Sequence, residues 1–269
     1  MSEIKDIIGA VGESNAEIVK EVYSDVARPF VQPTGEIAGL IPRAVKAALA
    51  PLEKWILQRE YNIAETKKLL EEKLKDVKPE SIEPPEAHVA VPALQYLSYC
   101  MDNEELRDMY ANLLANSMNS IIKKGVHPGF VEIIKQLSPD EAKVMKYFST
   151  YRTVPTITVR YELKNGSGVD VVKNFSDIGE KSGCEQPLDI NMYFDNLIRL
   201  GLLASSSGLS SLTNKELYVS LKNHPVIETY MEEEKIKGTH YEKGSIEEGF
   251  MSLTDFGEAF CNICLTTQT

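Results

Sequence analysis

The side chains best suited to chemistry form one row of polar residues between positions 105 and 127. Asp108, Asn112 and Asn116 are spaced four apart, so all three project from one face of a helix, and Asn119 follows one turn further on. Asn is a poor helix former, so its repetition within a helix indicates that the amides have specific partners. An acid and a histidine can transfer protons when they lie within hydrogen-bond reach. We call the candidate interaction residues of this stretch the polar row: Glu105, Asp108, Asn112, Asn116 and His127.

Two interpretations of the polar row stay open at the level of sequence. In the first, the row is a recognition surface or a small polar site, and catalysis is one use of such a site. In the second, the amides bond neighbouring backbone, for example the chain around residues 127–129. The sequence alone does not place any of these groups within hydrogen-bond reach of another.

A second candidate surface lies in residues 37–59, where an apolar helical face is combined with basic residues and the single tryptophan. Such a stretch can lie on an anionic membrane, with the aromatic ring at the interface. The membrane-contact candidates are Arg43, Lys46 and Trp55. Helices that pack inside soluble proteins have much the same pattern, so core packing is the alternative.

Cys261 and Cys264 form a CxxC pair, but no second closely spaced Cys or His pair accompanies it. Zinc sites need four ligands, so we expect two core-facing thiols and no structural metal. The sequence also lacks a phosphate-binding Gly-rich loop, a GxGxxG motif, an HExxH motif and a GxSxG motif. We therefore expect no cofactor and assign no catalytic residues.

The balance of charges argues against nucleic acid as a partner. The 269 residues contain 40 acidic and 29 basic side chains, for a formal charge of -11, which repels phosphate over most of the surface. The first residues do not have the form of a secretory signal, and no apolar run approaches the roughly 18 residues that span a bilayer. These features predict a cytoplasmic protein, with peripheral contact at the inner membrane as the alternative.

Helices must position the polar row, and the N-terminal half of the sequence has the apolar spacing of successive helices. Asp102 with Glu105 has the form of a capping box, and so does Ser138 with Glu141. Between these two helix starts, one apolar face is expected from Leu106, Tyr110, Leu113 and Ile121.

The pattern changes after about residue 138. A helix is followed by a strand over residues 156–163, a turn over 165–168 and an amphipathic helix over 189–200. Extended segments are predicted at residues 202–203, 218–221 and 250–251, before a last helix. This order resembles a winged-helix domain. The predicted fold class is mainly α, with an N-terminal helical bundle over residues 1–137 and a smaller α+β winged-helix-like domain over residues 138–269.

A winged-helix domain invites a DNA-binding hypothesis, in which residues 189–200 enter the major groove. That helix carries Asp189, Asp195 and only one basic residue, Arg199, whereas groove-entering helices need basic and amide side chains. Packing or dimerisation is therefore the favoured use of this region, and nucleic acid is an unexpected partner.

Three runs of sequence resemble one known family: PLEKWI at residues 51–56, the stretch from KLKDVKPESIEPPEAHVAVPAL to ANSMN at 73–119, and VHPGFVEIIKQLSPDEA at 126–142. Together they resemble the Abi-alpha family, a bacterial domain associated with abortive infection against phage, with a core at about residues 51–142. The resemblance implies a defence role and supplies no catalytic residues. We expect a non-enzymatic protein that acts through a protein partner, self-association or a membrane contact of its helical domain. The alternatives are an enzyme using the polar region from Asp108 to His127, or a winged-helix regulator.

Overall fold

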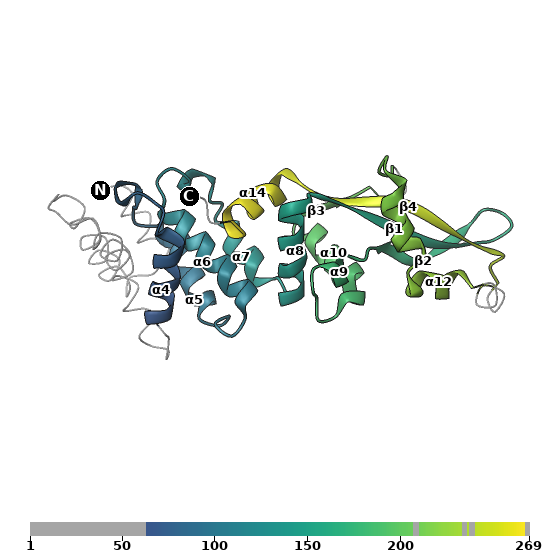
Figure 1. Ribbon diagram of the computed structural model, residues 1–269, viewed down its shortest axis with the longest axis horizontal. Helices are drawn as coiled ribbons and strands as arrows, with labels where there is room; N and C mark the ends of the chain where they lie inside the picture. The colour runs from purple at the N-terminus through teal and green to yellow at the C-terminus, as the bar shows by residue number, and fades with distance from the viewer. Residues whose placement is uncertain (1–62, 207–209, 233–235, 237–239, 267–269) are drawn as a thin grey trace, which may run out of the picture. The chain divides into compact units, whose positions relative to one another are not determined.

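The computed structural model describes residues 63–206, 210–232, 236 and 240–266, and the chain divides into two compact units (Figure 1). Unit 1 contains the described residues up to Lys135 together with Thr266, and unit 2 contains Gln136–Leu265. Arg43, Lys46 and Trp55 lie outside the described residues, as do the helices predicted before position 63. The chain therefore leaves unit 1 after Lys135 and returns to it at Thr266.

Unit 1 is built around a central helix, α6. All ten residues from Met109 to Met118 are buried, because α6 contacts the helices α4, α5 and α7. A helix that is enclosed in this way must pair any polar group it carries with a protein partner. The elements of unit 1 are α4 (Ile63–Leu74), η4 (Pro79–Ser81), α5 (Ala87–Leu97), α6 (Glu104–Met118), η5 (Lys123–Gly125) and α7 (Gly129–Lys135).

The two ends of α6 differ from the prediction. The N-cap is Asn103, whose side chain accepts a hydrogen bond from the backbone N–H of Leu106 at 2.9 Å, and not Asp102. At the other end the chain turns extended at Asn119, which forms an isolated antiparallel bridge with Ile82. Ile121 therefore lies beyond the helix, and its predicted place on the apolar face is wrong.

Unit 2 begins with the capping box predicted at Ser138. The Ser138 side chain accepts from the Glu141 backbone N–H, and the Glu141 carboxylate accepts from the Ser138 N–H, so this prediction is confirmed. The helices of unit 2 are α8 (Pro139–Tyr151), α9 (Ile178–Lys181), η6 (Pro187–Asp189), α10 (Ile190–Arg199), η7 (Lys215–Tyr218), α11 (Val219–Lys222), α12 (Pro225–Met231) and α14 (Asp255–Cys264).

The strands of unit 2 form a four-stranded antiparallel sheet in the order β2-β1-β4-β3. Its long central pair joins Thr153 to Ser252 at one end and Glu162 to Lys243 at the other (Figure 1). The Tyr161 hydroxyl of β1 donates to the backbone oxygen of Tyr230 in α12, so α12 packs on the face of the sheet that carries Tyr161. The strands are β1 (Thr153–Glu162), β2 (Gly168–Phe175), β3 (Leu203–Ser205) and β4 (Lys243–Leu253).

The predicted fold class, mainly α with an N-terminal helical bundle and a winged-helix-like domain, is wrong, because the structure is an α+β mixture with a substantial antiparallel sheet. The sequence of β2 and most of β4 hides the strand pattern, since β2 is an edge strand and β4 has Gly and charged residues along much of its length. The strand predicted over residues 218–221 is instead helical, in η7 and α11. The Asn214 side chain starts this turn by accepting from the Glu216 N–H.

Among the described helices, none has both the length and the apolar composition that crossing a bilayer needs.

Candidate functional site

The amides of the polar row lie inside unit 1. Asn112 is 3% exposed and Asn116 is 2% exposed, both on the enclosed part of α6. The Asn116 Nδ2 donates to the backbone oxygen of Thr266 at 3.2 Å, which fastens the returning C-terminal segment to α6. Burying a side-chain amide is costly unless it is hydrogen-bonded, so this bond explains an Asn in the middle of a helix.

The acidic members of the polar row lie nearer the start of α6. The Asp108 side chain is 44% exposed, and its carboxylate is 3.4 Å from the Lys73 Nζ of α4. Glu105 stands in the first turn of α6, where a negative charge is favoured by the unpaired backbone N–H groups of the helix start. Both carboxylates thus have positions that stabilise the helix.

His127 is exposed and lies two residues before the start of α7. Its Nδ1 accepts a hydrogen bond from the Gly129 N–H at 3.0 Å, and its ring lies 5.7 Å from the ring of Phe130. The ring thus accepts from the N–H of the first residue of α7, which has no acceptor within the helix. The structure therefore gives Asp108, Asn116 and His127 three separate structural roles, at an ion pair, a chain anchor and a cap.

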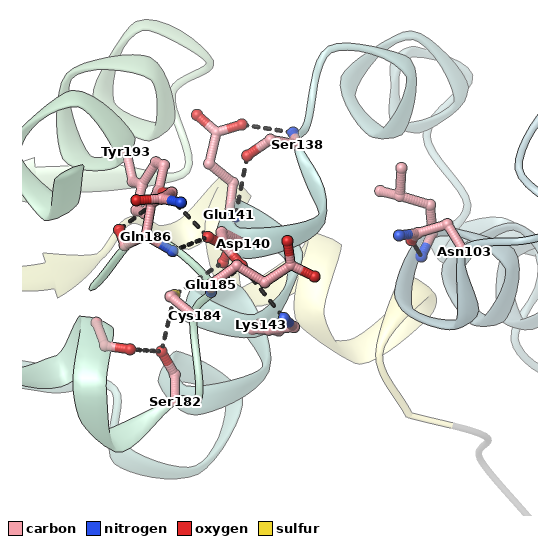
Figure 2. A network of polar contacts seen from close by, with 12 residues as sticks. Asn103, Ser138, Asp140, Glu141, Lys143, Ser182, Cys184, Glu185, Gln186 and Tyr193 are labelled. Carbon is pink, nitrogen blue, oxygen red and sulfur yellow. Dashed lines mark hydrogen bonds and ion pairs between the residues drawn. The ribbon is translucent and has the colours of Figure 1, made fainter. Parts of the chain in front are cut away.

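A larger polar network, which the sequence did not predict, surrounds Asp140 in the first turn of α8 (Figure 2). Its carboxylate accepts from the backbone N–H groups of Glu185 and Gln186, both at 2.9 Å, and from the Tyr193 hydroxyl at 3.0 Å. The Lys143 Nζ donates to the same carboxylate at 3.2 Å. Asp140 thereby joins α8, the loop before η6 and α10.

The electrostatics of this network favour a charged, fixed Asp140. Burial raises the pKa of the Asp140 carboxyl, but the hydrogen bonds from Gln186, Glu185, Tyr193 and Lys143 outweigh it and leave the pKa below its usual value. Burial and the neighbouring carboxylate raise the pKa of Tyr193 above its usual range. The acid stays ionised and the phenol stays protonated, so neither is poised to transfer a proton near neutral pH.

Cys184 lies at the edge of the same network. Its thiol is 3.3 Å from the Ser182 hydroxyl and donates to the backbone oxygen of Asp140 at 3.6 Å (Figure 2). Burial raises the pKa of the Cys184 thiol, whereas a nucleophilic cysteine needs a lowered one. Cys184, Asp140, Lys143 and Tyr193 lie close together here, and their hydrogen bonds hold the loop before η6 and α10 to the start of α8.

The sequence predicts where Asp140 lies in this network, but not its distant partners. The capping box at Ser138 fixes where α8 starts, and hence places Asp140 in its first turn. Lys143 lies one turn further along α8, but Glu185, Gln186 and Tyr193 lie 45 or more residues further on, and no periodicity in the sequence connects them to Asp140.

The helix of the DNA-binding hypothesis, α10, is tied to the start of α8. The Asn196 amide donates to the Glu141 carboxylate at 2.7 Å and to the Gln136 backbone oxygen at 3.1 Å. Arg199, the only basic residue of α10, donates to the side-chain oxygens of Gln136 and Asn196.

The CxxC pair lies on α14, with both thiols buried. Burial raises the pKa of Cys261 to about 12 and raises the pKa of Cys264 as well. Within the described ranges, no group of three or more His, Cys, Asp or Glu side chains has the arrangement of a metal site.

Comparison with known proteins assigns the chain to a family. A family profile described as abortive infection alpha matches residues 58–264, so the protein belongs to the abortive infection alpha family. The match reaches far beyond residue 142, where the runs noted in the sequence end, and it includes most of unit 2.

Two further comparisons add little to this assignment. A search of curated proteins found no match. A solved structure of an uncharacterized protein from the hydrocarbon-degrading marine bacterium Alcanivorax borkumensis SK2 is similar at 17% identity, with a TM-score of 0.37, over 51% of this chain and 92% of that one.

Proposed function

We propose that this protein acts in abortive infection as a binding protein and not as an enzyme. Family membership supports the defence role, in which infected bacterial cells stop growing before phage mature. The burial of Asn112 and Asn116 is the observation that carries the non-enzymatic part. Three residues of the site in the enzyme hypothesis make structural contacts instead: Asp108 pairs with Lys73 of α4, Asn116 binds Thr266, and His127 accepts from the first N–H of α7.

The other reactive groups support the same proposal. Asp140 is held ionised by four donors, and burial raises the pKa of Cys184 and Cys261. Each of these changes moves the group away from the pKa that acid–base or nucleophilic chemistry needs near neutral pH.

The edge of the sheet formed by β2 is a poor place for a partner to add a strand. β2 is interrupted by irregular register, and Asn174 within it has a φ of 49°. Lys173 is exposed on the same strand. Bulges and edge lysines are features that prevent strand addition. We therefore propose that the contact surface lies on unit 1. Its partner is a protein, a second copy of this chain or the inner membrane surface. We propose that the protein acts on the cytoplasmic side of that membrane.

A phage-challenge assay tests the proposal with variants that remove chemistry and keep structure. Glu105→Gln and Asp108→Asn remove the two carboxylates, and His127→Asn replaces the imidazole with a side chain that also caps helices. Each variant should protect cells as well as the wild type, provided that circular dichroism shows it to be folded.

Loss of protection in any one of these folded variants would instead favour the enzyme alternative, with a site around Asp108 and His127. Gly257→Ala, which should destabilise unit 2, provides the control for loss of protection through misfolding.

A further inference from the structure

His224 lies between three elements of unit 2, and its side chain is only 13% exposed. Its Nε2 is 3.2 Å from a carboxylate oxygen of Glu180 in α9, and the centre of its ring is 4.8 Å from that of Phe175 in β2. Its Nδ1 accepts a hydrogen bond from the Val226 N–H at 3.3 Å, in the first turn of α12. Both ring nitrogens of His224 are therefore in contact with polar groups.

The start of α12 depends on the acceptor at His224. Pro225, the first residue of α12, has no N–H, so Val226 carries the first one of the helix and donates it to the His224 ring. The N–H groups of Ile227 and Glu228 donate to the His224 backbone oxygen at 2.8 and 3.0 Å. Ile227 is fully buried, so the first turn of α12 holds an apolar side chain in the core.

The contacts of His224 require a neutral ring. A neutral imidazole has one N–H and one acceptor nitrogen, which suits donation from Nε2 to Glu180 and acceptance at Nδ1 from Val226. A protonated ring carries an N–H at both nitrogens, so Nδ1 would then turn a donor toward the Val226 N–H. The Glu180 carboxylate favours the protonated ring, whereas the Val226 N–H favours the neutral one. Binding of a proton therefore exchanges a helix cap for an ion pair.

Glu180 is the charged group in direct contact with the His224 ring. The other charged side chains on the elements around the ring are paired with each other or exposed: Asp177 with Lys181, Lys222 with Glu248, and the exposed Lys173 and Glu228. The exchange is thus governed by one carboxylate and one backbone N–H.

A similar cap occurs in unit 1. His127 is also followed by a proline, and its Nδ1 accepts from the N–H of Gly129, two residues further on. His127 is exposed, whereas the His224 ring is packed beside Phe175. Of the two histidines, His224 is therefore the one at which a change of charge acts on packed elements.

We propose that His224 is a pH-sensitive switch at the start of α12. The neutral ring caps α12. The protonated ring stays with Glu180, the Val226 N–H loses its acceptor, and the first turn of α12 opens. Histidine side chains ordinarily change charge between about pH 5 and 8, so the switch operates near neutral pH. This inference goes beyond the proposed function and does not depend on it.

Amide hydrogen exchange of the full chain, followed by NMR, tests the switch. Protection is the exchange rate of each N–H relative to that of an unfolded chain at the same pH. In the wild type, the protection of the Val226 and Ile227 N–H groups should be about fivefold lower at pH 5 than at pH 8, the factor that corresponds to the loss of one helix cap.

Two substitutions of His224 separate the cap from the charge. His224→Asn keeps a side chain that caps helices but binds no proton in this range, so its protection should be high and equal at both pH values. His224→Ala removes the cap, so its protection should be low and equal at both.

Two further variants identify the group that titrates. Glu180→Gln should move the fall in protection to lower pH, because the carboxylate that favours the protonated ring is gone. His88→Asn is the matched control, since His88 is an exposed histidine of α5 that also lies beside a carboxylate, that of Glu86. It should leave the pH dependence unchanged.

Three results would overturn the proposal: equal protection of the Val226 N–H at both pH values in the wild type, an equal fall in His224→Asn, or a fall that disappears in His88→Asn. The phage-challenge assay of the Glu105, Asp108 and His127 variants decides the proposed function separately, since none of those residues contacts α12.

Discussion

The side-chain amide of Asn116 donates a hydrogen bond to the backbone oxygen of Thr266, a residue 150 positions later. Between the two, the chain leaves unit 1, forms the whole of unit 2 and returns. The bond is made from the buried part of α6, so it fastens the end of the described chain to the centre of unit 1. Asn116 therefore holds Thr266, the residue at which the chain returns to unit 1.

Replacing Asn116 with Ala should lower the free energy of unfolding by about 1–3 kcal/mol, because a buried hydrogen bond is lost and its partner is left without that donor. The residues around Thr266 should also become more sensitive to carboxypeptidase. Urea unfolding and timed digestion measure the two effects. Asp108→Ala on the same helix is the control, since its partly exposed ion pair with Lys73 is worth at most about 1 kcal/mol. Equal losses in the two variants would contradict the anchoring role.

The helix that carries Asn116 can be predicted from the sequence, but the partner of Asn116 cannot. The spacing of Asp108, Asn112 and Asn116 correctly placed them along one helix, and the rarity of mid-helix Asn indicated specific partners. The partner of Asn116 could not be identified, because hydrogen bonds across 150 residues leave no periodic trace in one sequence. Asn119 and Ile121 were misplaced since the helix stops at Met118, where the next segment pairs with the chain at Ile82.

Only some strands of the sheet can be predicted from the sequence. β1 was visible as alternating apolar residues because it is a central strand with a buried face. β4 is one residue longer than β1, yet Lys243, Glu247 and Glu248 conceal it. Glu247 is exposed, Lys243 forms an ion pair with Glu162 of β1, and Glu248 forms one with Lys222 of α11. Local signals such as the Ser138 capping box were reliable because both partners lie within one turn.

Asp140→Asn should destabilise unit 2 by about 2–3 kcal/mol. Hydrogen bonds to a charged acceptor are among the stronger ones, and an amide in this position turns a donor toward the N–H groups of Glu185 or Gln186. Denaturant unfolding followed by circular dichroism measures the change. Asp195→Asn, an exposed change on α10, should alter stability by less than about 0.5 kcal/mol. Equal stability of the two variants would show that the network does not hold α8 and α10.

The contribution of Asp140 should also depend on pH. The pKa of this carboxyl is lowered in the folded state, so its contribution is present above the ordinary aspartate value of 3.8 and is lost as the pH falls through the lower folded value. The stability difference between the wild type and Asp140→Asn should therefore be constant from neutral pH down to about pH 5 and shrink below about pH 4. Unfolding midpoints measured over this range give the difference directly. A difference that grows in acid would contradict the sign of the shift.

Gly257→Ala should destabilise the protein although it places a better helix former in α14. A Cβ at this position would overlap the backbone oxygen of Leu202, to which the start of α14 is joined by the Thr254 N–H. The gain in helix propensity is about 1 kcal/mol, while forcing backbone apart in a packed core costs about 1–3 kcal/mol and more for a direct overlap with backbone. We expect a net loss of about 2 kcal/mol in the free energy of unfolding. Asn262→Ala on the exposed side of the same helix is the control, and a variant at Gly257 as stable as that control would exclude the close approach.

The four thiols should divide into two classes by their rate of reaction with Ellman's reagent. Cys100 and Cys184 are half-buried and should react first, although burial raises the pKa of each. Cys261 and Cys264 are buried on α14, and with the pKa of Cys261 at about 12 almost no thiolate is present near neutral pH.

A bound metal would also protect the CxxC pair, so the slow class needs a second measurement. Adding a chelator to the native protein should leave the slow rate unchanged, because packing in the core protects both thiols. Adding urea should expose them together, in step with the unfolding of unit 2. Release of zinc by the chelator, with faster labelling of Cys261 and Cys264 in the absence of urea, would show instead that these thiols are metal ligands.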